Sequence, residues 1–314
     1  MKYVLITPAH NEEKFIAKTL DSMVAQTLLP QRWVIVDDGS TDRTAEIVQG
    51  YTERFRWIEL FRRRRRLDRN FAGKVQAFNA GFERLVGLPF DVIGNLDADL
   101  SFEPDYLEFL LRKFSEDPHL GVAGTPFTED GGYDSARDSF EGENHVAGGC
   151  QLFRRQCFEE VGGYVPNPAG GIDWIAVTTA RMKGWRTRSF REKRFRHYRS
   201  LGTAGRSGAA ASFSYGEKDY YLGGSPLWQL FRVSYRTMKH PVDGLALLAG
   251  YCWAGLRRIE RPVSWELVRF HRQEQMKKLR TIFRTLLSLK KVDNFQLATE
   301  GSSQKSEVRG QRSV

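Results

Sequence analysis

The chain has 314 residues, of which 41% are hydrophobic and 27% are charged. This composition is ordinary for a globular protein and excludes a wholly disordered, collagen-like or coiled-coil chain, while the length fits about one or two domains. The net charge is +10, and this surplus lies in residues 225–314, where 17 Lys or Arg face 7 Asp or Glu.

The first half of the chain predicts strands and helices in alternation. Apolar runs and helical periodicity place strands at 2–7, 33–36, 57–61, 92–96 and 121–124, and helices at 12–26, 41–51, 74–85 and 104–114. This order is typical of an open, parallel α/β sheet, whose ligands bind beyond the carboxyl ends of the strands. Carboxylates stand at two of those ends: Asp37 and Asp38 follow the second strand, and Asp97 and Asp99 follow the fourth.

The second half has a less regular pattern. Glycine-rich patches separate short segments, and residues 202–224 predict a long, mobile loop. Helical stretches rich in aromatic and basic residues follow over 226–298, and the polar residues 299–314 predict a disordered tail.

The C-terminal stretches suggest a membrane contact but no span. Residues 242–256 are apolar, but they number 15 and contain Asp243, whereas a span needs about 20. Residues 265–291 predict a basic amphipathic helix, which suits either an anionic membrane surface or packing on the rest of the protein. Trp228, Trp253 and Trp265 stand among arginines and favour the first, so we expect a peripheral membrane contact through residues 226–291.

Two features predict the compartment. The amino terminus turns polar after about six residues, short of the ~7–15 apolar residues of a secretory signal. The cysteines are scattered and include no Cys-x-x-Cys pair, which excludes a disulfide framework and a structural zinc cluster. We therefore expect a cytoplasmic protein, peripheral on the cytoplasmic face of the membrane.

Two acidic motifs point to chemistry. Asp97-Ala98-Asp99 offers two carboxylates at a strand end, and Mg²⁺ or Mn²⁺ takes such oxygens together with phosphate. The alternative for this motif is a turn with a helix cap at Asp99 or Ser101. Asp37-Asp38-Gly39-Ser40 offers acceptors for a nucleobase N–H or a ribose hydroxyl, or forms an ordinary strand-to-helix turn.

Four motifs in order make residues 3–200 resemble the family 2 glycosyltransferases with the GT-A fold. Pro8-Ala9-His10-Asn11-Glu12 is similar to the family's P-x-[YH]-N-E, and residues 36–42 are similar to its V-D-D-G-S-T-D. Gly73-Lys74 with Asn79-Ala80-Gly81 matches its basic residue followed by N-x-G, and Asp97–Asp99 matches its D-x-D.

The resemblance implies an α/β fold of the GT-A (Rossmann-like) type, a mixed sheet flanked by helices, with a C-terminal helical extension. It implies a catalytic domain at 1–225, with a nucleotide-sugar half at 1–125 and an acceptor half at 126–225. The implied reaction moves a sugar from a nucleoside diphosphate sugar, UDP-linked, to the hydroxyl of a glycan or lipid-linked acceptor, with inversion. Synthesis of a cell-surface polysaccharide or a lipid-linked glycan is the implied setting.

Roles for single residues follow from the same resemblance. The residues implied to line the base and ribose pocket are Pro8, Ala9, His10, Glu12 and Asp38. Lys74 would lie near the base or diphosphate, Asp97 would contact the ribose, and Asp99 would bind the Mg²⁺ or Mn²⁺ that stabilises the leaving diphosphate.

The base and a second metal ligand are expected downstream. An inverting transfer needs a base for the acceptor hydroxyl, and Asp173 after Gly170-Gly171 matches the family's acid, although Ile172 stands where a first acid is often found. The alternative is that Asp173 caps the helix 174–183. His197 stands where many relatives carry a His near the metal or diphosphate, although a lone His is more often structural.

Nearby charges add competitors and helpers. The competing acids in the loop before Asp173 are Asp130, Asp134, Asp138 and Glu141. The arginines that stand near enough in sequence to reach phosphate are Arg194, Arg196 and Arg199. We expect the stretch to residue 224 to form a lid over the donor.

Other functions are weighed against this one. A nucleotidyltransferase would need a glycine-rich, basic phosphate loop near the amino terminus, which residues 8–12 do not offer. A non-catalytic binder of anionic membranes or nucleic acid is the second alternative. The run 62–66 of five arginines predicts a solvated loop without stacking aromatics, so no nucleic acid partner is expected. A processive synthase is disfavoured because the family's Q-x-x-R-W motif and a full membrane span are missing from the sequence.

Overall fold

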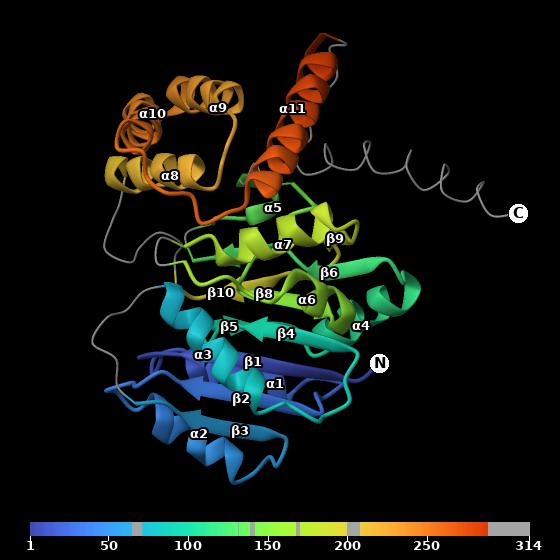
Figure 1. Ribbon diagram of the computed structural model, residues 1–314. Coiled ribbons are helices and arrows are strands. Elements are labelled where there is room, and N and C mark those ends of the chain that lie inside the picture. The colour runs from blue at the N-terminus through green and yellow to red at the C-terminus, as the bar shows by residue number, and fades with distance from the viewer. Residues whose placement is uncertain (65–70, 131, 139–141, 168–169, 200–207, 288–314) are drawn as a thin grey trace, which may run out of the picture. The chain divides into compact units, whose positions relative to one another are not determined.

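A computed structural model describes residues 1–64, 71–130, 132–138, 142–167, 170–199 and 208–287 (Figure 1). The chain divides into two compact units. The sheet unit comprises residues 1–138 and 145–200, and the helical unit comprises residues 139–144 and 201–314. The predicted disordered tail at 299–314 lies outside the described residues.

The sheet unit contains the mixed sheet that the sequence predicts. Among the described residues, seven strands pair in the order β3-β2-β1-β4-β8-β6-β9. The parallel strands are β1 (Tyr3–Ala9), β2 (Arg32–Asp37), β3 (Ile58–Arg62) and β4 (Val92–Leu96). Antiparallel β8 (Cys150–Arg154) lies between β4 and β6 (Leu120–Gly124), and β9 (Arg186–Ser189) runs parallel to β6. Because both faces are covered, these strands are continuous apolar runs, which is why the sequence located them.

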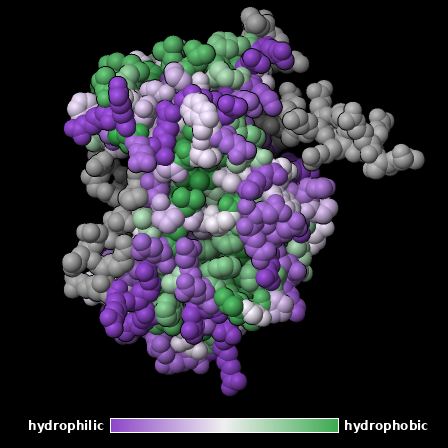
Figure 2. Space-filling model, in the orientation of Figure 1, coloured by the Kyte–Doolittle hydropathy of each residue, from purple (hydrophilic) through white to green (hydrophobic). Residues whose placement is uncertain are grey.

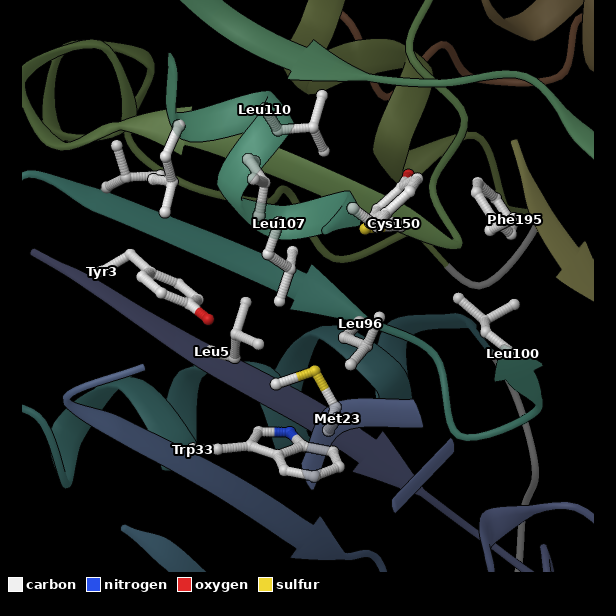
Figure 3. Close-up of a cluster of buried hydrophobic side chains, with 14 of the residues drawn as sticks. Tyr3, Leu5, Met23, Trp33, Leu96, Leu100, Leu107, Leu110, Cys150 and Phe195 are labelled. Carbon is white, nitrogen blue, oxygen red and sulfur yellow. The ribbon is translucent and has the colours of Figure 1, made fainter. Parts of the chain in front are cut away.

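Helices pack on both faces of this sheet. They are α1 (Ile16–Val24), α2 (Thr44–Thr52), α3 (Phe71–Glu83), α4 (Tyr106–Glu116), α6 (Arg155–Val161) and α7 (Ile172–Met182), while the short α5 (Ser135–Asp138) contacts β7 (Phe127–Glu129) of a second sheet. Tyr3 and Leu5 of β1 join one buried cluster, and Val4 and Ile6 join another on the opposite face. Figure 3 shows the first cluster, in which Trp33 of β2 and Leu107 of α4 approach β1 from two sides.

A smaller sheet positions residues beyond the end of β4. It has three strands in the described residues, in the order β5-β10-β7: β5 (Leu100–Ser101), β10 (Phe195–His197) and β7 (Phe127–Glu129). The register places His197 opposite Leu100 on one side and opposite Glu129 on the other. Segments almost a hundred residues apart in sequence therefore meet beside Asp99.

The helical unit confirms a C-terminal helical extension and corrects one prediction. Its helices are α8 (Ala209–Tyr221), α9 (Pro226–Lys239), α10 (Pro241–Leu256) and α11 (Trp265–Leu287). The expected loop at 202–224 is wrong over 209–221, because these residues form α8. Gly216 lies where α8 meets α10. A Cβ there would overlap the carbonyl oxygen of Leu247, so the absence of a side chain lets the two helices approach each other closely. The lid that we expected from this loop is not supported.

Candidate active site

Polar side chains gather beyond the carboxyl ends of β1, β2 and β4. These strands are parallel neighbours, so the residues that follow them lie along one edge of the sheet. His10 and Glu12 follow β1, Asp38 follows β2, and Asp97 follows β4. This edge is where an open α/β sheet binds its ligands.

Asp38 is held in place by three neighbours. Its backbone N–H donates to the Ala9 carbonyl at 2.8 Å, and its own carbonyl lies 2.9 Å from His10 Nδ1. Arg63 Nη1 donates to the Asp38 carboxylate at 2.7 Å. The preceding Asp37 is buried and accepts the Ser40 N–H at 2.9 Å, so it shapes the turn. Asp38 is therefore the less buried of the two acids, and its carboxylate lies beyond the end of β2.

The arginine run after β3 behaves differently from our expectation of a solvated loop. Arg62 lies 3.4 Å from the Asp37 carboxylate, and Arg63 pairs with Asp38. The reason is register: β3 is parallel to β2 and places Arg62 opposite Asp37, so the next residue lies beside Asp38. Residues 65–66 of the run lie outside the described part of the chain.

Pro8 and Ala9 of β1, which were expected to line the nucleotide pocket, belong to the sheet and keep most of their side chains from solvent. Ala9 is buried in the core, and Pro8 is a half-buried residue paired with Val36 in the sheet. Asn11 adopts a left-handed conformation, with φ of 55°, and its side chain accepts the Thr41 N–H at 2.8 Å. The motif thus joins the loops after β1 and β2.

Lys74 of α3 reaches the edge of the sheet and pairs with Asp97. Its Nζ lies 2.5 Å from Asp97 Oδ1, and Asn95 Nδ2 donates to the same oxygen at 3.2 Å. Burial alone would lower the pKa of Lys74, but Asp97, Asp173 and Asp99 outweigh it and raise that pKa above its ordinary value. Lys74 is therefore a charged ammonium that pairs with Asp97 and is stabilised by the charges of Asp173 and Asp99.

Asp173 joins this cluster from the first turn of α7. Its side chain lies directly on Gly148, where an added Cβ would be 2.8 Å from Asp173 Cβ and 3.0 Å from Oδ2. The Gly148 carbonyl in turn accepts a hydrogen bond from Asn95 Nδ2 at 2.6 Å. The N-cap of α7 is Gly171, with φ of 80°, so the alternative role of Asp173 as that helix's cap is not supported.

Asp99 lies in a buried, charged niche beside the small sheet. Its side chain faces His197 Nε2 at 3.5 Å and Arg199 Nε at 3.7 Å. His197 Nδ1 lies 3.3 Å from Glu129, and Arg199 Nη2 donates to Glu12 at 2.5 Å. Burial first, and then the neighbouring Asp97, raise the pKa of Asp99 despite the opposing His197, Arg199 and Lys74.

The side chains around Asp99 suit a divalent cation whose coordination is completed by phosphate and water. In the part of the chain that the structure describes, no three His, Cys, Asp or Glu side chains are grouped to enclose a metal by themselves. Asp99 and His197 nevertheless face each other, and Asp99 carries a desolvation penalty that a cation would relieve. Mg²⁺ and Mn²⁺ commonly bind through one or two protein ligands plus phosphate and water.

The expected residues thus fall into two linked groups on the same edge. His10 and Asp38 meet next to Ala9, while Glu12, Lys74, Asp97, Asp99, Asp173 and His197 form a continuous charged cluster. The competing acids are engaged elsewhere: Asp130 pairs with Arg196 and Asp134 with Arg194. The side chain of Asp138 and the whole of Glu141 lie outside the described part.

Sequence reasoning missed several residues that build this site. Asn95 ties Asp97 to Gly148, and Glu129 orients His197. Gly81 of the N-x-G motif, which the sequence did single out, serves packing and not the site, because a Cβ there would lie 2.7 Å from Ile6 and 2.9 Å from Val36. The sequence of β4 held a usable signal for Asn95, since a polar residue inside an otherwise apolar strand needs a hydrogen-bonding partner.

Comparison with known proteins gives the family. Residues 4–162 match the family model described as glycosyl transferase family 2. The poly-β-1,6-N-acetyl-D-glucosamine synthase of Staphylococcus aureus is 31% identical over 120 residues, which cover 37% of this chain and 26% of that protein. The chain spans about a quarter or less of the length of the first curated relatives that it matches.

Solved structures give the same fold. The mannosyltransferase PcManGT of Pyrobaculum calidifontis, in complex with GDP-Man and Mn²⁺, superposes with a TM-score of 0.56 at 18% identity over 97% of this chain and 86% of that one. S. aureus TarS 1–349 in complex with UDP-GlcNAc superposes with a TM-score of 0.55 at 17% identity over 99% and 93% of the two chains. The GT-A fold that the sequence implied is confirmed.

Proposed function

Because this chain belongs to glycosyl transferase family 2, we propose that it moves a sugar from a UDP-linked sugar to an acceptor hydroxyl with inversion. The observation that carries the proposal is the convergence of Asp97, Asp99 and Asp173 around Lys74. The three acids come from two distant parts of the chain, and a fold alone does not require a half-buried ammonium beside them.

The nucleoside end of the donor is assigned to the group around Asp38. Its carboxylate is an acceptor for a nucleobase N–H, and Arg63 beside it is a donor for a base carbonyl. His10 lies between the two strand ends, and we assign Asp97 to accept a hydrogen bond from the ribose. TarS was solved with UDP-GlcNAc and PcManGT with GDP-Man, so the neighbours support a nucleoside diphosphate sugar and leave uracil as our own choice.

A divalent cation is assigned to Asp99 and His197. When bound there, it would supply positive charge to the diphosphate leaving group. The carboxylate and imidazole donors suit Mn²⁺ better than Mg²⁺, which prefers oxygen ligands. PcManGT was solved with Mn²⁺, which supports this part of the proposal.

Asp173 is assigned as the base. In an inverting transfer the acceptor oxygen bonds to the anomeric carbon as the bond to the diphosphate oxygen breaks, and the hydroxyl proton passes to the base. Asp173 lies in the first turn of α7, and its charge acts on Lys74, so the acid and the ammonium belong to one electrostatic cluster. Lys74 also places an ammonium where negative charge develops on the leaving group.

The acceptor and setting are assigned more broadly. The S. aureus relative is named a poly-β-1,6-N-acetyl-D-glucosamine synthase, which supports a glycan or lipid-linked acceptor in cell-surface polysaccharide synthesis. We place the reaction in the cytoplasm, where nucleotide sugars are made.

The test is release of nucleoside diphosphate from UDP-GlcNAc and from GDP-Man, with Mn²⁺, with Mg²⁺ and with a chelator. We expect turnover with the UDP sugar and Mn²⁺, and a loss of at least about a hundredfold in Asp173→Asn. Glu83→Gln on α3 is a matched carboxylate control. Unchanged turnover in Asp173→Asn would reassign the base, and pyrophosphate release from a sugar phosphate and a nucleoside triphosphate would replace the whole proposal by a nucleotidyltransferase.

A further inference from the structure

The helices α9 and α10 of the helical unit expose large hydrophobic side chains. On α9 these are Leu227, Leu230 and Met238, and on α10 they are Val242, Leu245, Trp253 and Leu256. Met238 is 86% exposed and Leu256 is 80% exposed. Figure 2 shows hydrophobic residues gathered over these two helices. Soluble surfaces seldom keep so many apolar side chains together unless something covers them.

The exposed apolar residues form one stripe on each helix. On α10 the exposed positions 241, 242, 245, 249, 252, 253 and 256 fall within about 120° of arc for a helix of about 3.6 residues per turn. On α9 the exposed positions 227, 230, 234 and 238 have the same spacing as 242, 245, 249 and 253, and exposed Arg236 and Lys239 lie outside this stripe. Such a stripe is the face that an amphipathic helix normally turns toward a core.

The core side of α10 is already occupied by its own unit. Gly244, Leu247, Gly250 and Ala254 are its buried positions, and they lie on the opposite side of the helix from the stripe. Gly250 meets α8 so closely that a Cβ would overlap the carbonyl oxygen of Phe213. One apolar face of α10 therefore packs on α8, and the other apolar face is exposed and would be buried only against another apolar surface.

Basic side chains mark the ends of this surface. Residues 226–258 carry five Lys or Arg and one acid, Asp243, which lies 3.8 Å from Arg236. Arg257 lies over the ring of Trp253 at 4.6 Å, and Lys239 lies over Tyr235 at 4.7 Å. Cations and a Trp beside an apolar stripe complement the phosphate and acyl layers of an anionic bilayer.

From this charge and apolar pattern we propose that α9 and α10 together dock this protein on the surface of an anionic lipid bilayer. The helices lie in the interface, since none of the described helices is long and apolar enough to cross a membrane. The docking element is this pair and not α11, whose Leu267, Val268 and Ile282 are buried, with Val268 packed on Gly223. The proposal is independent of sugar transfer.

The experiment is co-sedimentation of the full chain with vesicles of phosphatidylcholine, with and without about 30% phosphatidylglycerol. We expect binding to the anionic vesicles. The double variant Leu245→Gln with Leu256→Gln should lower the partition coefficient at least about tenfold, because two apolar contacts with the acyl layer are lost. Leu227→Gln with Met238→Gln on α9 is an independent arm with the same expected loss.

Controls separate the lipid from other occupants. Val86→Gln changes an 82% exposed apolar residue of the sheet unit and should leave binding unchanged. Lys239→Gln with Arg257→Gln should remove the preference for anionic vesicles. The proposal is overturned if the unaltered protein does not co-sediment with anionic vesicles. It is also overturned if both apolar double variants have the same partition coefficient as the unaltered protein. It is equally overturned if light scattering shows a dimer that these variants dissolve, since a second copy would then cover the surface.

Discussion

The contact between Gly148 and Asp173 makes the assignment of the base testable without removing its carboxylate. Gly148→Ala places a methyl group 2.8 Å from Asp173 Cβ, 3.0 Å from Oδ2 and 3.1 Å from Cγ. Ordinary contacts of this kind begin near 3.4 Å, so Asp173 or the loop must move by about 0.5 Å or more. The φ angle of Gly148 is not in the left-handed region, so the backbone tolerates alanine.

A shift of this size has a calculable effect. A misplacement of about 1 Å at a reacting group costs up to about a hundredfold in rate, so we expect kcat to fall about 10- to 100-fold, or about 1.4–2.7 kcal/mol of barrier. The residues assigned to the nucleobase, Asp38 and Arg63, follow β2 and β3 and lie outside α7, so the Kd for the nucleoside diphosphate should change much less than kcat. Overpacking should lower the free energy of unfolding by about 1–3 kcal/mol.

The assay measures initial rates at saturating donor, together with nucleotide binding by calorimetry. Gly50→Ala in α2 is the matched control, since a Cβ there meets nothing within 4 Å. Combining Gly148→Ala with Asp173→Asn should add little to the loss from Asp173→Asn alone, because both act on one group. An unchanged kcat in Gly148→Ala, or equal losses of kcat and nucleotide affinity, would refute the placement of Asp173 at the reacting centre.

Three further changes test other parts of the structure. Lys74→Met leaves Asp97, Asp99 and Asp173 without their shared cation, so calorimetry should show donor affinity at least about tenfold weaker, and an unchanged Kd would contradict the role of Lys74. Because the pKa of Asp99 is raised in the folded protein, ionising this carboxyl lowers the free energy of unfolding. This loss is absent below the ordinary pKa of 3.8 and grows as the pH rises through the raised pKa. Asp99→Asn should therefore raise the Tm of the metal-free protein at pH 7 and abolish metal-dependent turnover, and a lowered Tm would show that the pairing of Asp99 outweighs its burial. Gly250→Ala should lower the free energy of unfolding, measured in urea, by about 1–3 kcal/mol, because the added Cβ overlaps the backbone of α8. An unchanged free energy of unfolding would contradict the close approach of α8 and α10.

Sequence reasoning located the strands and the acids that follow them because both signals are local. Runs such as residues 33–36 are buried on two faces, and the acids mark where those runs end. Arg63 was missed because its position depends on the pairing of β3 with β2, which no local pattern records. His197 and Glu129 likewise meet only through the pairing of β10 with β7.

Glycines account for the main errors in the helical half. Residues 202–224 suggested a loop because Gly in a helix is costly, yet Gly216 allows a helix contact that compensates for it. The apolar stripe of α11 was recognised, but periodicity cannot tell which of two apolar helices faces its own unit and which faces outward. The structure resolves this by burying Val268 of α11 and exposing Leu245 of α10.

The placement of β10 has a consequence for when this enzyme becomes competent during synthesis. Asp97, Asp99 and Lys74 belong to the first hundred residues, whereas His197 and Arg199 reach Asp99 from almost the end of the sheet unit. A nascent chain that has left the ribosome only as far as α7 has all three acids and no imidazole beside Asp99. On the proposed assignment of a cation to Asp99 and His197, the cation site is complete only after β10 has been synthesised, so a shorter translation product holds the acids without the imidazole.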